Sequence, residues 1–266
     1  MLDARVEVIS NEEIAADFYL ARLRAPQIAA AQPGQFVEVQ TSETTAPFLR
    51  LPLSICGVDK QAGTADILFE DMGPKTRALS LIRSGQEIAC LGPLGKGFTA
   101  PAAGQSVVLV GGGIGIPPLL FLGERLCRAG HQVCLLAGAR VGSKHLPDAM
   151  LQAAAGIVRQ ATDDGSVGHH GLVTDLLTEE LAADASAAVY TCGPHGMMAA
   201  VTTVCSQAQV ACQASLEEYM ACGFGVCVGC VVEVEPEAGG ELSPYLQYSR
   251  VCVDGPVFDA HRVKWE

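Results

Sequence analysis

The chain has 266 residues, 49% of them hydrophobic, and its 17 Lys and Arg against 29 Asp and Glu leave a formal net charge of −12. The length allows about two domains and the apolar content is enough to fill their cores, which excludes an intrinsically disordered protein. The acid excess, with no run rich in Lys or Arg, argues against nucleic acid or an anionic membrane as the partner.

The 11 cysteines are an odd number, and the first 11 residues contain neither the basic nor the apolar region of a signal peptide. Closely spaced cysteines in a reducing compartment more often serve metal or redox chemistry than disulfides. We therefore expect a cytoplasmic protein whose thiols stay reduced.

The first hundred residues are predicted to form a small antiparallel β-barrel. Six short segments, β-branched or alternating in hydropathy, are separated by Gly, Pro, Ser or Asn: 5–9, 18–23, 35–40, 51–55, 64–70 and 87–91. Short strands with such spacing are typical of barrels. We assign 1–100 to this domain.

From residue 106 the pattern changes to an alternation of strands and helices. Predicted strands and helices follow one another in the order 107–110, 117–129, 132–136, 156–160, 173–179, 187–191 and 197–207. This alternation favours an α/β domain with a doubly wound parallel sheet. We assign 101–210 to it.

Two loops of this domain are candidates for binding a dinucleotide. The first strand ends in a glycine turn that opens a helix, where backbone N–H groups and the helix N-terminus attract a pyrophosphate. The second loop ends a later strand, and the carboxyl ends of parallel strands meet at one edge of a sheet. Glycine turns of this kind are also often only structural. The candidate residues are Gly111, Gly112, Gly113, Ile114, Gly115, Cys192, Gly193 and Pro194.

A cluster of cysteines dominates the last part of the chain, which we assign as a separate module, 211–266. Cys222, Cys227 and Cys230 form C-x4-C-x2-C, and Cys252 follows after 21 intervening residues. This is the spacing of plant-type 2Fe-2S ferredoxins, and the glycines between the cysteines allow the backbone to curl around a cluster. A structural zinc site is the main alternative, although such sites usually have two C-x2-C pairs. A disulfide is a further alternative.

The same module carries half of the net charge. It has three basic residues and a net charge of −6, so an electron leaving here would meet a partner with a relatively basic surface. The alternative is an ordinary solvated acidic face. The nine acidic residues are Glu217, Glu218, Glu233, Glu235, Glu237, Glu241, Asp254, Asp259 and Glu266.

A barrel, a nucleotide domain and a 2Fe-2S module in this order resemble the ferredoxin-NADP reductase superfamily. The chain resembles more closely the family of electron-transfer subunits of class 1B dihydroorotate dehydrogenase. The resemblance covers nearly the whole chain. It rests on LPLSI (51–55), GPKT (73–76), GPLGKGF (92–98), GGGIGIPP (111–118), TDDG (162–165), EYMACGFGVCVGC (218–230) and RVCVDGPVF (250–258).

The resemblance implies FAD on the barrel, with Ser54 beside flavin N5 as the catalytic candidate; alternatively, Ser54 is bonded to backbone. The family has an arginine for the flavin phosphate where this chain has Leu51, and Arg50 stands one residue earlier, on the other face of a strand. Either a bulge restores the arginine, or Lys75, Thr76 and backbone amides hold the phosphate. The flavin contacts implied are Leu51, Pro52, Leu53, Ser54, Ile67, Leu68, Phe69, Gly73, Lys75 and Thr76, of which Ile67, Leu68 and Phe69 are otherwise plain core.

The family further implies oxidation of NADH at FAD and passage of single electrons through the 2Fe-2S cluster. The acceptor would be an FMN-containing catalytic subunit that interconverts dihydroorotate and orotate, in a heterotetramer of two subunits each. An alternative keeps the cofactors but changes the partner, as in NADH-dependent ferredoxin-NADP reductases or sulfhydrogenases. A different class is a zinc-stabilised, nucleotide-binding interaction protein. The choice between NADH and NADPH stays open.

Overall fold

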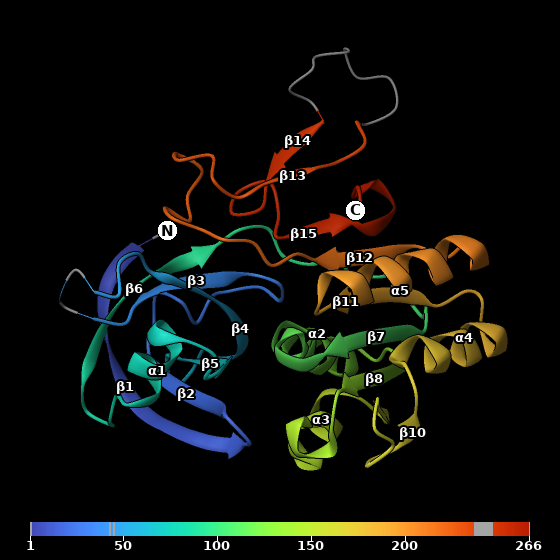
Figure 1. The fold of residues 1–266 in the computed structure, drawn as a ribbon, viewed down its shortest axis with the longest axis horizontal. Helices are drawn as coiled ribbons and strands as arrows, with labels where there is room; N and C mark the ends of the chain where they lie inside the picture. The colour runs from blue at the N-terminus through green and yellow to red at the C-terminus, as the bar shows by residue number, and fades with distance from the viewer. Residues whose placement is uncertain (1, 43, 45, 237–246, 266) are drawn as a thin grey trace.

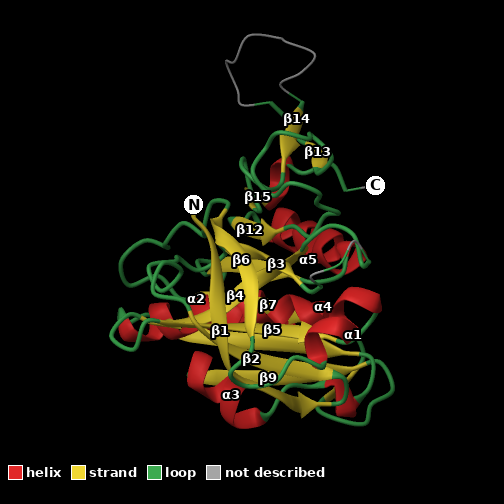
Figure 2. Ribbon diagram, turned by 90° about the vertical axis from the view of Figure 1, so that its left-hand side faces the viewer, coloured by secondary structure: helices red, strands yellow, loops and turns green. Residues whose placement is uncertain are grey.

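A computed structural model describes residues 2–42, 44, 46–236 and 247–265 of the chain. The barrel and the parallel sheet lie side by side, and the hairpin β13–β14 lies beyond both (Figure 1). The view turned by 90° shows this hairpin projecting at one end of the molecule (Figure 2). The predicted combination of barrel, parallel sheet and small C-terminal module is confirmed.

The barrel is closed, with strand order β1-β2-β5-β4-β3-β6 and antiparallel neighbours throughout. Val37 and Val39 on β3 alternate with outward residues and pack inside the barrel, as do Leu53 and Ile55 on β4. All six predicted strands are present, and the helix α1 (Pro74–Ser80), not predicted, follows β5. The strands are β1 (Leu2–Ala15), β2 (Phe18–Arg24), β3 (Phe36–Gln40), β4 (Leu51–Asp59), β5 (Thr64–Glu70) and β6 (Glu87–Leu94).

The second sheet has seven strands in the order β10-β9-β8-β7-β11-β12-β15. The first six run parallel, and β15 joins the edge antiparallel to β12. The predicted strands correspond to β7, β8, β9 and β11; β10, β12 and β15 were not predicted, because two to four residues carry too little pattern. The strands are β7 (Val107–Gly112), β8 (Val133–Ala139), β9 (Ile157–Thr162), β10 (His169–His170), β11 (Ala188–Cys192), β12 (Cys212–Ser215) and β15 (Val257–Asp259).

Helices cover both faces of this sheet. Buried residues of α2 (Ile116–Arg128) and α3 (Asp148–Ala154) pack with one set of strand residues, and those of α4 (Val173–Ala183) and α5 (His195–Ala208) pack with the other. The helix α3 was not predicted. Short 3-10 turns at Gly113–Gly115, Gly142–Lys144 and Ala260–Arg262 complete the elements. No helix within the described ranges is long and apolar enough to cross a membrane.

The C-terminal module is an excursion from the edge of the sheet. The chain leaves at the end of β12, forms the cysteine loop and the hairpin of β13 (Val231–Glu233) and β14 (Tyr248–Arg250), and returns as β15. The Lys96 N–H donates to the Gly255 carbonyl at 2.6 Å, which ties the returning segment to the barrel. Domain limits at 100 and 210 remain predictions.

Candidate redox site

The four predicted cluster ligands lie together in two pairs. The Cys227 N–H donates to Sγ of Cys222 at 3.5 Å, and the Cys252 N–H donates to Sγ of Cys230 at 3.4 Å. The side chains within each pair also contact each other. The first pair belongs to the loop alone, whereas the second joins the loop to the segment that leads to β15.

This pairing is informative about the metal. A 2Fe-2S cluster with four cysteine ligands takes two thiolates on each iron, whereas a structural zinc ion needs four ligands around one centre. The cysteines therefore fit a two-iron cluster better than zinc.

The loop also provides the electrostatics that a thiolate cluster needs. Burial alone would raise the pKa of the Cys222 thiol, but backbone N–H groups of Cys227, Phe224 and Val226 directed at its sulfur lower this pKa to about 6. The loop turns by positive φ at Gly223 and Gly225, at 73° and 87°. Inward-facing amides of this kind stabilise negative sulfur.

The outer side of the loop is exposed and apolar. Cys227 is exposed, and Phe224, Val226 and Val228 beside it are 42%, 74% and 52% exposed. Of the acidic residues counted in this module, Glu237, Glu241 and Glu266 lie outside the described residues. The cysteines therefore lie beneath a surface that another protein can approach.

Residues of the strand β4 alternate between the interior and the outer face of the barrel. Leu53 is buried inside the barrel, and Leu51 packs partly against the same core. Pro52 and Ser54 alternate with them and are half-buried on the outside. Ser54 is thus on the face where the flavin is expected, and its role stays a prediction.

Arg50 lies directly before β4 and is held by an ion pair. The register between β3 and β4 is regular from Val39 opposite Leu51 to Phe36 opposite Ser54, and Arg50 lies just before this paired segment. Its guanidinium forms a two-point ion pair with Asp3, at 3.0 and 2.8 Å. In this structure Arg50 is engaged by Asp3, and which residues bind the flavin phosphate stays a prediction.

Of the two α1 candidates, Lys75 is better suited than Thr76 to bind the flavin phosphate. The Thr76 hydroxyl accepts hydrogen bonds from the N–H groups of Met72 and Gly73 and donates to the Gly73 carbonyl, so it shapes the turn. Lys75 Nζ donates to the Arg50 carbonyl at 2.9 Å and adds a positive charge beside β4. A Cβ at Gly73 would meet nothing within 4 Å, which leaves room for a bound group.

The residues predicted on β5 are all interior. Ile67 and Phe69 pack inside the barrel, and Leu68 packs between the barrel and the parallel sheet. All three are 2% exposed or less. Their side chains are buried in the core, so only their backbone atoms could contact a flavin.

The two predicted dinucleotide loops lie next to each other. Gly111 at the end of β7 is paired with Cys192 at the end of β11. A Cβ at Gly115 would lie 2.4 Å from the Cys192 carbonyl, and one at Gly193 would lie 3.0 Å from the backbone of Gly112. These glycines therefore allow the loops to approach closely, while Gly113 has a positive φ of 53° and open space around it.

A pocket of about 350 Å³ opens beside the second loop. It is lined by Gly193 and Pro194, by Glu233 of the module and by Lys264 near the C-terminus. Ile114 packs against the core of the sheet and Cys192 is buried, so their contribution to binding would be structural or through backbone. The pocket lies where the nucleotide domain meets the cysteine module.

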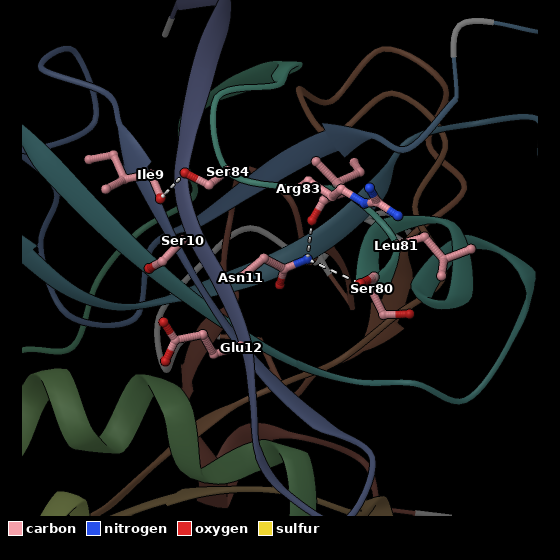
Figure 3. Close-up of a pocket in the computed structure, with 9 residues that line it drawn as sticks. Ile9, Ser10, Asn11, Glu12, Ser80, Leu81, Arg83 and Ser84 are labelled. Carbon is pink, nitrogen blue, oxygen red and sulfur yellow. Dashed lines mark hydrogen bonds between the residues drawn. The ribbon is translucent and has the colours of Figure 1, made fainter.

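A second pocket, of about 590 Å³, lies on the barrel between β1 and the segment after α1 (Figure 3). Asn11 points across it, and its side-chain N–H₂ donates to the carbonyls of Leu79, Ser80 and Ile82. No predicted site residue lines this pocket. Its hydrogen bonds hold the segment after α1 in place.

One buried residue near the site was not predicted. Glu38 on β3 has 0% exposure, and neither carboxyl oxygen has a hydrogen-bond partner among the described residues. Burial raises its pKa to about 7, although Lys75 and Arg50 lower it. In the sequence FVEVQ it looks like an ordinary outward residue of an amphipathic strand, and only the packing of another module onto β3 buries it.

Comparison with known proteins places these features in context. Residues 217–264 match the family described as the iron-sulfur cluster binding domain of dihydroorotate dehydrogenase B, and 109–203 match the oxidoreductase NAD-binding domain. The chain is 38% identical over 261 residues to a dihydroorotate dehydrogenase B (NAD(+)) electron transfer subunit of Desulforamulus reducens, covering 98% of this chain and 97% of that protein. It is 39% identical over 267 residues to the Listeria monocytogenes protein of the same name, covering 99% and 100%.

Solved structures agree on the fold. A structure described for flavin-based electron bifurcation, of an NADH-dependent reduced ferredoxin-NADP oxidoreductase, superposes with a TM-score of 0.86 at 29% identity, covering 98% of this chain and 90% of that one. A Neisseria gonorrhoeae ferredoxin NADP+ reductase with bound FAD and NADP shares the fold, with a TM-score of 0.64 at 17% identity, over 77% of this chain and 91% of that one.

Proposed function

We propose a function for this chain from its membership of the family of dihydroorotate dehydrogenase B (NAD(+)) electron transfer subunits. The chain oxidises NADH at an FAD bound to the barrel. It then passes the electrons one at a time through a 2Fe-2S cluster to a catalytic subunit. The observation that carries the proposal is the two-by-two pairing of Cys222 with Cys227 and of Cys230 with Cys252, against the barrel.

Each part of the site has one task. The loops 111–115 and 192–194 bind and orient the dinucleotide at the edge of the sheet. Ser54 orients the reacting edge of the flavin, and Lys75 neutralises its phosphate. A bound FAD supplies a centre that can exchange electrons both in pairs and singly, which the protein's own side chains cannot do. The cysteines hold the irons close to the barrel face.

We propose that the partner is an FMN-containing subunit that interconverts dihydroorotate and orotate, in an assembly of two subunits of each kind. The exposed Phe224, Val226 and Val228 surround the cluster loop and offer an apolar centre for its docking. The acidic character of the module favours a basic partner surface, so association should slow as salt is raised. We assign the complex to the cytoplasm, where the chain's free thiols stay reduced.

A second candidate keeps the same cofactors and serves another oxidoreductase. The likeness to the ferredoxin-NADP oxidoreductase over 98% of this chain supports it, because that protein's chain has the same overall arrangement. The zinc-stabilised interaction protein is disfavoured by the paired cysteines.

An anaerobic spectrum of the purified chain tests the proposal. We expect flavin and iron-sulfur bands, iron and sulfide in equal amounts, and bleaching of both bands by NADH more efficiently than by NADPH. The co-purified partner should then reduce orotate at the expense of NADH. A colourless protein that contains zinc would contradict the function outright, and bleaching without orotate reduction by the complex would favour the second candidate.

A further inference from the structure

Glu38 lies between the expected flavin face and the cysteine loop. On β3 it is paired with Pro52 of β4, and Phe36 two residues earlier is paired with Ser54. Directly paired residues point to the same side of a sheet, so Glu38 and Ser54 are diagonal neighbours on one face, with Cα atoms typically about 7–8 Å apart. Glu38 therefore lies on the same face as Ser54, although its carboxyl oxygens form no hydrogen bond with the Ser54 hydroxyl.

The other side of Glu38 is covered by the cysteine loop. A Cβ at Gly223 would lie 2.6 Å from Cγ of Glu38 and 2.9 Å from its Oε1, so the loop backbone rests directly on the carboxyl group. Phe36 and Leu91 beside it belong to the same buried cluster as Cys230 and Cys252. The carboxyl group is thus enclosed between the two places where the electrons are handled.

An enclosed carboxyl group without a partner is costly to keep. Both oxygens of Glu38 are buried with no hydrogen bond from any described residue. If position 38 served only to fill space, an apolar side chain of similar size would pack equally well and would leave no oxygen without a hydrogen bond. The position therefore calls for a chemical role.

The proposed function leaves one proton unaccounted for. Oxidation of one NADH delivers a hydride, which is two electrons and one proton, while the cluster takes one electron at a time and no proton. For every two electrons that leave through the cluster, one proton must be transferred to a base. We propose that the carboxylate of Glu38 takes up this proton from the flavin edge and later returns it to solvent.

The charges that face Glu38 suit a reversible acceptor. Lys75 on α1 and Arg50 before β4 favour the carboxylate, and the sulfur-bearing residues that face it are Cys222 of the loop and Cys90 on β6, of which burial raises the pKa of Cys90 to about 12. Burial outweighs the two cations and brings the pKa of Glu38 to about 7. Glu38 is therefore protonated more easily than an ordinary exposed carboxyl group.

The test rests on the proposed function and compares two steps in the same protein. The holoprotein is mixed anaerobically with NADH, and flavin bleaching and the electron paramagnetic resonance signal of the reduced cluster are followed separately. In Glu38→Gln we expect flavin bleaching close to the wild-type rate and cluster reduction at least ten-fold slower, since positioned acid–base groups contribute about 10²–10⁴-fold. The solvent deuterium isotope effect and the pH dependence of this second step should disappear, and Glu38→Asp should restore part of both.

Glu87→Gln is the matched control, because Glu87 is exposed at the start of β6 on the same barrel. It should leave both steps unchanged. If Glu38→Gln reduces its cluster at the wild-type rate, Glu38 does not accept the proton. The same conclusion follows if cluster reduction in the wild-type protein shows no solvent isotope effect, and this second measurement does not depend on the folding of the variant. A wild-type protein whose cluster never receives electrons from NADH overturns the proposed function itself.

Discussion

The cysteine loop and the flavin–nucleotide face of this protein are built in opposite ways. Three of the four cluster ligands lie within nine consecutive residues, 222–230, and the amides that lower the pKa of Cys222 come from the same loop. The proposed flavin–nucleotide face is assembled from β3, β4, α1, β7 and β11, which are far apart in the sequence. A site formed by one short loop depends strongly on each of its few residues. A site formed by several elements depends less on any single contact. The predictions below test that difference.

The largest effect is expected from one cluster ligand. Cys252→Ser removes a thiolate from the second pair, and the loss of electron transfer to the partner should exceed the roughly 10–100-fold typical of residues that only support a metal ligand. NADH should still bleach the flavin, because the barrel and the sheet are intact. Iron analysis and the electron paramagnetic resonance signal measure the cluster. Cys127→Ser is the control, and full iron content in Cys252→Ser would contradict the assignment.

A smaller effect is expected where two loops of the assembled site meet. Gly115→Ala places a Cβ 2.4 Å from the Cys192 carbonyl, which forces the loops apart. Overpacking of this kind costs about 1–3 kcal/mol in the free energy of unfolding, and NADH affinity should fall with it. Gly196→Ala is the control, since its Cβ meets nothing within 4 Å. Chemical denaturation measures the free energy of unfolding, and titration measures the affinity for NADH. Equal values of these quantities in the two variants would mean that the loops are not closely packed.

Removal of iron should reveal the electrostatics of the loop. The lowered pKa of about 6 makes Cys222 mostly thiolate at pH 7 in the iron-free protein. An ordinary thiol has a pKa near 8.5, so the thiolate fraction of Cys222 is about thirty-fold larger. Alkylation followed by mass spectrometry should show Cys222 reacting with a midpoint near pH 6, fully reactive above it and protected below it. A midpoint at an ordinary thiol pKa would mean that the amides do not stabilise the thiolate.

The smallest effect is expected on the flavin face. Ser54→Ala removes one hydrogen bond among many contacts, and a single bond contributes about 0.5–1.5 kcal/mol, or up to roughly ten-fold in the rate of flavin bleaching by NADH. Flavin content should stay complete. Ser10→Ala, on β1 of the same barrel, provides the comparison in the same stopped-flow measurement. A loss as large as that of Cys252→Ser would show that the flavin face is not a distributed site.

The same difference explains what could be read from the sequence. The six barrel strands and the strands β7, β8, β9 and β11 have enough residues for their period to be visible, whereas the pairing of β15 with β12 depends on a contact between distant segments. The spacing of the cysteines in the C-x4-C-x2-C loop is enough to predict that they lie together. Arg50 and Glu38 could not be assigned, because the first is held by Asp3 across the barrel and the second is buried by the loop around Gly223.

The neighbouring positions of β12 and β15 have a consequence for how such a protein can arise. Since the chain departs from and rejoins the same sheet edge on adjacent strands, the two ends of the segment between Ser215 and Val257 are directly paired, which in a sheet means about 5 Å apart. A short turn could join them without disturbing the strands on either side. The iron-sulfur module is therefore an insertion between two adjacent strands, and its removal would leave the sheet edge intact while exposing the residues of the barrel and of the C-terminal segment that pack against it.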